Sequence, residues 1–199
     1  GSDNKLILIK IISIFRSQDD FIIKKTLMQE EIFPLVDEQG IVVGQASRSV
    51  CHDGSKLLHP VIHLHIFNSK GELYLQKRSA TKDVQPNRWD SSVAGHIDLN
   101  ETPEKAALRE ASEELNISDI IPRYITKYII ETDRERELSY CYYAIYVGDF
   151  TLNTEELADG RFWTIDEIQN ELGKDVFTLN FESDFRLFLH KGSQNIAQQ

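Results

Sequence analysis

Three glutamates, Glu110, Glu113 and Glu114, stand close enough together in the sequence to act on one ligand. On a helix, which turns about 100° per residue, their carboxylates share one face. Like charges three and four residues apart cost roughly 0.2–0.5 kcal/mol per pair, and acids in a last helical turn oppose the helix dipole. A divalent cation such as Mg²⁺ or Mn²⁺ removes both penalties, because oxygen atoms are its preferred ligands. A solvated acidic face, relieved by Arg109 four residues before Glu113, is the alternative.

The helix that carries these glutamates has recognisable ends. Thr102-Pro103 supplies an N-cap and a first-turn proline, the helix is predicted to run to about Leu115, and Asn116 suits the left-handed conformation just past it. The apolar side chains at helical spacing are predicted to form its buried face: Ala107, Leu108, Ala111 and Leu115. The helix is therefore expected to pack by one side and to present its acids on the other.

Strand and helix patterns flank this helix on both sides. Two hairpins are predicted, from residues 32–36 with 41–43 and from residues 61–67 with 72–78. Further strands are predicted over residues 89–93, 124–131, 138–147 and 161–163. A capping box from Thr164 to Glu167 predicts a helix to about Leu172, and apolar spacing predicts another over residues 181–190, ended by Gly192. The predicted fold class is α+β, a mixed β-sheet with helices packed on it.

Composition restricts the classes of protein to which this chain can belong. Its 199 residues are 41% hydrophobic, enough for one domain, and its net charge of −10 disfavours binding to a nucleic-acid polymer. Cys51 and Cys141 match no zinc or disulfide pattern, so both are expected to be free and reduced in a cytoplasmic protein. The longest apolar stretch, residues 6–15, is too short to span a membrane. Residues 1–27 are predicted to be an N-terminal extension, or sequence upstream of a native start at Met28, and residues 28–199 one domain.

The segment from Gly95 to Ile117 resembles the signature of the Nudix hydrolase superfamily, Gly-x5-Glu-x7-Arg-Glu-U-x-Glu-Glu-x-Gly-U, where U is aliphatic. The matching residues are Gly95, Glu101, Arg109, Glu110, Glu113, Glu114 and Ile117. Two positions depart from it, with Ala111 in place of a larger aliphatic residue and Asn116 in place of the second glycine. The resemblance implies a Nudix-type α/β/α sandwich that hydrolyses a diphosphate bond in a nucleoside diphosphate derivative or a related substrate.

The resemblance also implies roles for the matching residues. The three glutamates and the carbonyl group of Gly95 would bind Mg²⁺ or Mn²⁺, which lowers the pKa of a bound water. One of the glutamates would be the general base, and the sequence does not distinguish which. Arg109 would pair with Glu101 and so hold the preceding loop against the helix.

A second resemblance, to the isopentenyl-diphosphate isomerase branch of the Nudix fold, involves histidines. His52, His59 and His96, with Glu135 and Glu137, fall at the positions of that branch's metal ligands. Three imidazoles and two carboxylates suit Zn²⁺ or Mn²⁺, so a second divalent ion is predicted there. His63 and His65, which alternate along one predicted strand, are assigned no function.

Basic residues and one missing thiol complete the comparison with the isomerase. Arg48, Arg78 and Lys82 fall where that branch binds the diphosphate, and would give an acidic protein a local positive pocket. The isomerase has a catalytic cysteine before its Gly-His pair, whereas this chain has Ala94. The prediction is therefore a hydrolase of a small soluble diphosphate, and an isomerase or a sensor without turnover is the alternative. No membrane partner is predicted, and a homodimer is expected from general frequency alone.

Overall fold

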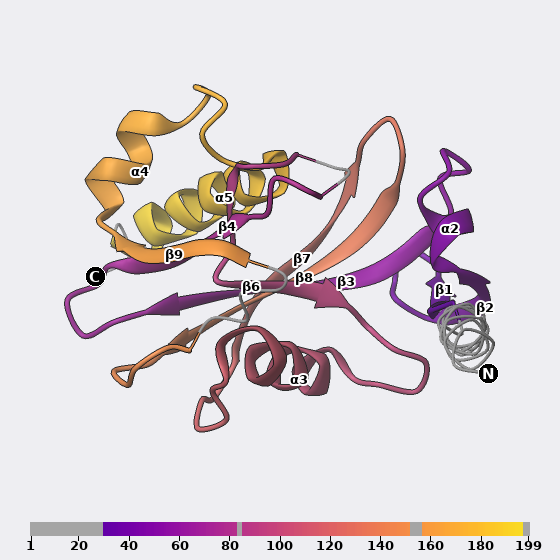
Figure 1. Ribbon diagram of the computed structural model, residues 1–199. Helices are drawn as coiled ribbons and strands as arrows, with labels where there is room; N and C mark the ends of the chain where they lie inside the picture. Colours follow the sequence, from indigo (N-terminus) through magenta and orange to yellow (C-terminus); the bar gives the residue numbers. More distant parts are fainter. Residues whose placement is uncertain (1–29, 83–84, 152–156, 197–199) are drawn as a thin grey trace, which may run out of the picture. The chain divides into compact units, whose positions relative to one another are not determined.

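The computed structural model describes residues 30–82, 85–151 and 157–196 (Figure 1), so the extension predicted for residues 1–27 lies outside it. From Ile32 onward the chain forms one compact unit. Its centre is a seven-stranded mixed sheet with the order β5-β4-β3-β8-β7, in which β6 also pairs with β3 and β9 with β4. The strands are β3 (Leu58–Phe67), β4 (Leu73–Arg78), β5 (Trp89–Asp90), β6 (Val93–His96), β7 (Arg123–Glu131), β8 (Arg136–Ile145) and β9 (Leu157–Trp163).

Two strands outside this sheet form a hairpin of their own. β1 (Ile32–Val36) pairs antiparallel with β2 (Val42–Ser47), and a single helical turn, α2 (Arg48–Cys51), follows directly. The sequence pattern predicted the hairpin but not α2. The short helix matters because His52, at its C-terminal end, is one of the candidate metal ligands.

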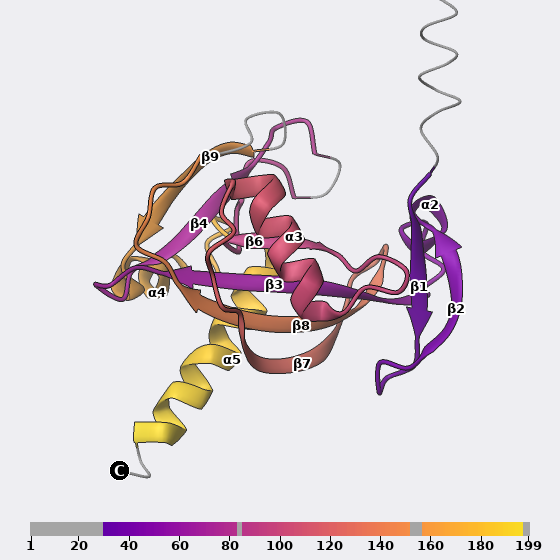
Figure 2. The same ribbon diagram turned by 90° about the horizontal axis from the view of Figure 1, so that it is seen from below.

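The helices cover opposite faces of the sheet, as two views at right angles show (Figures 1 and 2). α3 (Pro103–Leu115) lies on one face, and α4 (Ile165–Glu171) and α5 (Leu179–Ile196) lie on the other. Because side chains alternate along a strand, β3 supplies both faces. Its even-numbered residues Ile62, Leu64 and Ile66 are fully buried in one core cluster with Ala107, Ala111 and Leu115 of α3. Its histidines point to the α5 side.

The predicted boundaries of α3 and α4 are confirmed. Thr102 caps α3 by accepting a hydrogen bond from the Lys105 amide, and Asn116 ends the helix at φ 54°. The capping box at Thr164 is present in both directions. Gly192 does not end the last helix, which continues to Ile196, and the predicted strand 89–93 is two short strands, β5 and β6. No helix in the described part of the chain is long and apolar enough to cross a membrane.

The burial of α3 differs from its predicted pattern. Leu108 is 37% exposed, whereas Ala106 and Glu114 are buried. At about 100° per residue, the buried arc extends from Ala106 to Leu115 and has Glu114 near its middle, which places Leu108 just beyond its edge. The prediction that the helix packs by one side and presents all its acids on the other is therefore wrong, because one of the three acids points inward.

Candidate metal and phosphate site

Gly95 and Glu110 are in van der Waals contact at the junction of β6 and α3. A Cβ atom built on Gly95 would overlap the carboxyl group of Glu110. Gly95 pairs with Ile62 of β3, so its backbone is fixed in the sheet, and Glu110 is held by the helix that packs on that strand. Any larger side chain at position 95 would displace the end of the Glu110 side chain, because the carboxylate approaches the backbone this closely.

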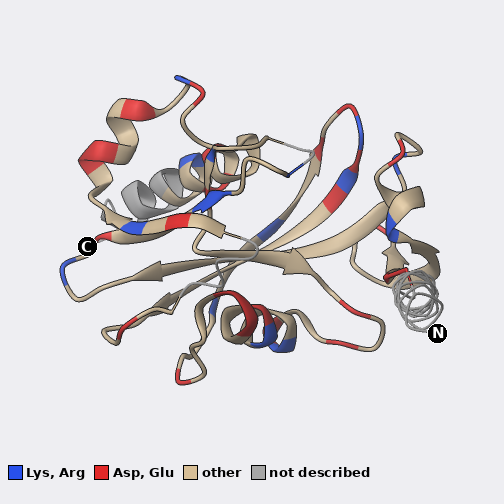
Figure 3. Ribbon diagram, in the orientation of Figure 1, with Lys and Arg blue, Asp and Glu red and all other residues tan. Residues whose placement is uncertain are grey.

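Arg109 holds the acidic side chains of this region together. Its guanidinium donates to both oxygens of Glu101, from Nε at 3.0 Å and from Nη2 at 2.9 Å. Nη1 also donates to Glu110 Oε1 at 2.7 Å and to Glu113 Oε2 at 3.4 Å, and Nη2 donates to the His96 carbonyl at 3.0 Å. Figure 3 shows that the ribbon of α3 carries both basic and acidic residues. The predicted pair between Arg109 and Glu101 is present, and it is bidentate.

The charges in this cluster stabilise one another. The hydrogen bonds that Arg109 donates to Glu101 raise the pKa of Arg109 above its ordinary value. Partial burial acts to raise the pKa of Glu101, but the hydrogen bonds from Arg109 outweigh it, and the pKa lies below its usual range. Both groups are therefore charged at neutral pH, and the fork that joins the loop to α3 stays intact.

The three glutamates of α3 lie at different depths. Glu114 is only 7% exposed, and Gln76 of β4 donates from Nε2 to its Oε2 at 3.2 Å. The side chain of Glu110 is 14% exposed and that of Glu113 is 58% exposed. Gln76 Oε1 is buried without a hydrogen-bond partner among the described residues. The three carboxylates therefore lie at an inward, an intermediate and an outward position, and they are not among the groups of described side chains whose ligand atoms all lie within 4.8 Å of one another.

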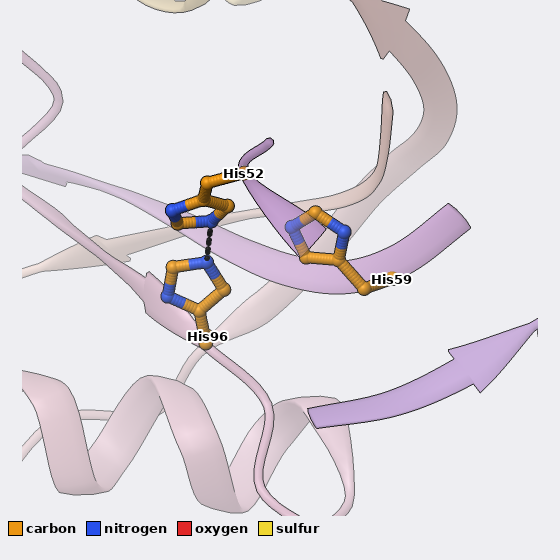
Figure 4. A group of neighbouring side chains, drawn as sticks. All are labelled: His52, His59 and His96. Atoms are coloured by element: carbon orange, nitrogen blue, oxygen red, sulfur yellow. Dashed lines mark hydrogen bonds between the residues drawn. The ribbon is translucent and has the colours of Figure 1, made fainter. Parts of the chain in front are cut away.

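The three predicted histidine ligands come together from three elements (Figure 4). His52 follows α2, His59 is in β3 and His96 ends β6. The Nε2 atoms of His52 and His96 are 3.2 Å apart, and one ligand atom of each of the three histidines lies within 4.8 Å of the others. Because His59 Nδ1 donates to the Leu57 carbonyl at 2.9 Å, its Nε2 is left with a lone pair. That Nε2 is buried and has no hydrogen-bond partner in the part of the chain the structure describes.

The two predicted acidic ligands lie next to the histidines. His52 Nε2 is 3.4 Å from Glu135 Oε2, and His59 Nε2 is 3.9 Å from Glu137 Oε1. Burial raises the pKa of Glu137 to about 7, and neighbouring Glu135 adds to the effect. Burial also lowers the pKa of His59 and, more strongly, that of His96. Neutral imidazoles, two carboxylates and an unpartnered buried nitrogen fit a divalent cation.

Two residues that the sequence analysis did not identify contact the histidines and their neighbouring glutamates. Phe33 of β1 stacks on His96 with ring centroids 4.0 Å apart and planes at 6°, and on His59 at 5.8 Å and 16°. Asn180 of α5 donates to Glu137 Oε2 at 3.1 Å. No local pattern could have indicated these partners, because each comes from an element distant in sequence.

The predicted basic residues have separate surroundings. Arg48 lies over the Phe33 ring, 5.9 Å from its centroid, and its charge contributes to lowering the pKa of His96. Arg78 is 3.2 Å from Asp90 Oδ2, and Lys82 is exposed beyond the end of β4. Ala94 is the register partner of His63, and Cys51 and Cys141, the two cysteines of the chain, are buried and free. Position 94 therefore carries a methyl group where the isomerase branch has a thiol.

Two sets of side chains therefore lie beside β6. Gly95 and His96 are consecutive in an extended strand, so their side-chain directions point to opposite faces of the sheet. The glutamates of α3 are on the Gly95 side, and the histidines are on the other. Arg109 connects the two through the His96 carbonyl.

Comparisons with known proteins identify the family to which the fold belongs. The NUDIX domain family matches residues 57–181. The chain is similar to a Listeria monocytogenes protein named an uncharacterised Nudix hydrolase, with 40% identity over 114 residues, 56% of this chain and 67% of that protein. It is also similar to the isopentenyl-diphosphate Delta-isomerase of Streptomyces avermitilis, with 28% identity over 153 residues, 74% of this chain and 78% of that protein. A crystal structure from Deinococcus radiodurans superposes with a TM-score of 0.68 and 25% identity, over 78% of this chain and 98% of that one.

Proposed function

The chain belongs to the Nudix family of pyrophosphohydrolases, and we propose that its α3 glutamates bind Mg²⁺ or Mn²⁺ to hydrolyse the diphosphate bond of a nucleoside diphosphate derivative. The observation that carries this proposal is the contact between Gly95 and Glu110. The contact places the Glu110 carboxylate against the backbone of Gly95, whose carbonyl group we propose as a further oxygen ligand.

The residues of this chain divide the work of the reaction. Glu110, Glu113 and Glu114 supply oxygen donors, and Gln76 and Arg109 fix two of these carboxylates by hydrogen bonds. A divalent cation held there would neutralise phosphate oxygens and lower the pKa of the attacking water. One of the three glutamates accepts the proton of the attacking water. The diphosphate breaks at one P–O bond, so the oxygen of the water ends on one phosphate and the leaving phosphate takes a proton.

A diphosphate substrate is negatively charged, and so is the protein as a whole. The formal net charge of −10 repels a phosphate, so attraction depends on the bound cation and on nearby basic residues. We assign this role to Arg48, Arg78 and Lys82, as the resemblance to the isomerase branch implies. The proposed partner is a small soluble diphosphate, and the histidine set is proposed to hold a second divalent ion, Zn²⁺ or Mn²⁺.

The test is release of phosphate or nucleotide from nucleoside diphosphate sugars, dinucleotides and prenyl diphosphates, with Mg²⁺ or Mn²⁺ supplied. Glu114→Gln should reduce turnover by about 10²–10⁴-fold, whether the residue acts as a base or as a ligand. The control is Glu171→Gln on α4, which removes the same charge at a position outside the site and should leave turnover unchanged. Equal activity of the Glu114 variant and the wild type would contradict the proposal.

Isomerisation is the second candidate, because the histidine set and the similarity to the Streptomyces isomerase favour it. The residue at position 94 opposes it, since alanine can neither donate nor accept a proton. Conversion of isopentenyl to dimethylallyl diphosphate by the wild-type chain would establish this function. Ligand binding without turnover of any member of the panel would instead indicate a sensor.

A further inference from the structure

A third cluster of metal-ligating side chains lies beneath α5, apart from the two sets described above. It consists of His63 and His65 of β3, Cys141 of β8 and Asp184 of α5. All four side chains are buried, and Asp184 is 3% exposed. None of them belongs to the α3 glutamates or to the histidine set at His59.

Strand pairing explains why these residues meet. His63 and Cys141 are register partners in the parallel pair β3–β8, and His65 follows His63 on the same face of its strand. α5 lies on this face and brings Asp184 to both (Figures 1 and 2). His59 and Glu137 are another register pair of the same strands, four residues earlier, or about 13 Å along the strand. The two clusters are therefore separate sites.

The ligand atoms are spaced as metal ligands are. His63 Nδ1 is 2.7 Å and His65 Nε2 is 3.2 Å from Asp184 Oδ2, and Cys141 Sγ is 3.2 Å from Asp184 Oδ1. Ligand atoms of His63, Cys141 and Asp184 all lie within 4.8 Å of one another. Ligands of tetrahedral zinc, at about 2.0–2.3 Å from the ion, stand about 3.3–3.8 Å apart. His63, Cys141 and Asp184 form the compact part of the cluster, and His65 joins it through its contact with Asp184.

The chemistry of the donor set is the second argument. One thiolate, one carboxylate and two neutral imidazoles around a divalent cation make an electrically neutral group, which is the charge balance that a buried ion requires.

We propose that His63, His65, Cys141 and Asp184 form a buried structural site for a zinc-type divalent cation that fastens α5 to the central strands. Two imidazoles, a thiolate and a carboxylate fill a tetrahedral shell, and a closed four-ligand shell is typical of structural rather than catalytic zinc. Binding releases the thiol proton of Cys141 and any proton on the two imidazoles. Tyr128, whose hydroxyl donates to Asp184, would orient the carboxylate from behind.

The sulfur ligand distinguishes this site from the other two candidate sites among the described residues, because the α3 glutamates and the histidine set contain no sulfur. X-ray absorption of the zinc-loaded full chain should show a sulfur neighbour at about 2.3 Å from the metal. In the cobalt(II)-substituted protein, a thiolate-to-cobalt charge-transfer band should be present. Cys141→Ser should abolish the band, whereas Cys51→Ser, which alters the other buried thiol, should retain it.

One further variant tests whether the cobalt–thiolate band belongs to this site or to the histidine set. His59→Ala removes a ligand of the histidine set and should leave the cobalt–thiolate band in place. If Cys141→Ser does not fold, the absorption spectrum of the wild-type protein decides. Zinc without a sulfur neighbour, or a band that disappears with Cys51→Ser, would overturn the proposal and leave the cluster a metal-free hydrogen-bond network.

Discussion

Replacement of Gly95 by alanine isolates the contact on which the proposed reaction depends. The added methyl group would overlap the Glu110 carboxyl group, which must move by about 1 Å before carbon atoms reach their ordinary separation of about 3.5 Å. A displacement of this size in a reacting group costs about 10²-fold in rate, equivalent to about 2.7 kcal/mol of transition-state free energy. The expected kcat/KM of Gly95→Ala is therefore about a hundredth of the wild-type value.

The same substitution should affect stability much less than activity. The group that must move is the end of a flexible side chain, so the overpacking penalty should be near the lower end of its range, about 1 kcal/mol. In a domain of this size that lowers Tm by about 2–4 °C. Gly44→Ala is the matched control, because its Cβ would make an ordinary contact with Leu35 at 3.8 Å and should change neither quantity.

A double-mutant cycle tests the stated cause. If Gly95→Ala acts by displacing Glu110, it should cost little further activity in a Glu110→Gln background, because the two changes remove the same interaction. Activity of Gly95→Ala near the wild-type level would refute the reasoning. An undiminished hundredfold loss in the Glu110→Gln background would also refute it, since the effect would then lie elsewhere.

Three further predictions each concern a group at one of the three proposed sites. Arg109→Lys retains the charge but loses the bidentate fork to Glu101, and kcat/KM should fall about 10–100-fold, measured with saturating metal. Asn180→Ala removes the hydrogen bond to Glu137 and should weaken Mn²⁺ binding at the histidine set about 10–100-fold by calorimetry, whereas Ser183→Ala on the same helix should not. In chelator-treated protein, the raised pKa of His65 should contribute stability that is fully present below pH 6.5, the ordinary pKa of a histidine. The free energy of unfolding should therefore fall as the pH rises from 6.5 through about 9. A His65→Gln variant with the same pH profile would contradict this prediction.

The parts of the molecule that the sequence could predict are those that depend on neighbouring residues. The N-cap Thr102, the left-handed Asn116 and the Thr164 capping box are local arrangements, so their positions follow from residue type and spacing. The arrangement of Arg109 and Glu101 is also local, since one helix and its preceding loop contain both. These features fixed the position of α3 and brought its glutamates to one region of the fold.

The errors arose where burial depended on a distant strand. Glu114 was predicted on an exposed face, but Gln76 of β4 accommodates it inside the protein. Nothing near Glu114 in the sequence distinguishes it from Glu113, which is exposed. The buried arc of α3 is therefore set by the surface it packs against, and Leu108 is displaced from it although its residue type favours burial.

The histidines of β3 show that residues with the same local pattern can have different functional partners. His59, His63 and His65 all point to the same face of one strand, but only His59 was assigned a role, because its partners His52 and His96 match a known spacing. The partners of His63 and His65 are Cys141, on another strand, and Asp184, on the last helix, and they approach only when β8 and α5 have packed. The alternation of a strand thus supplies a row of potential ligands, and the elements that cover it decide which of them meet. A buried imidazole on such a strand gains its chemistry from the distant helix that packs over it.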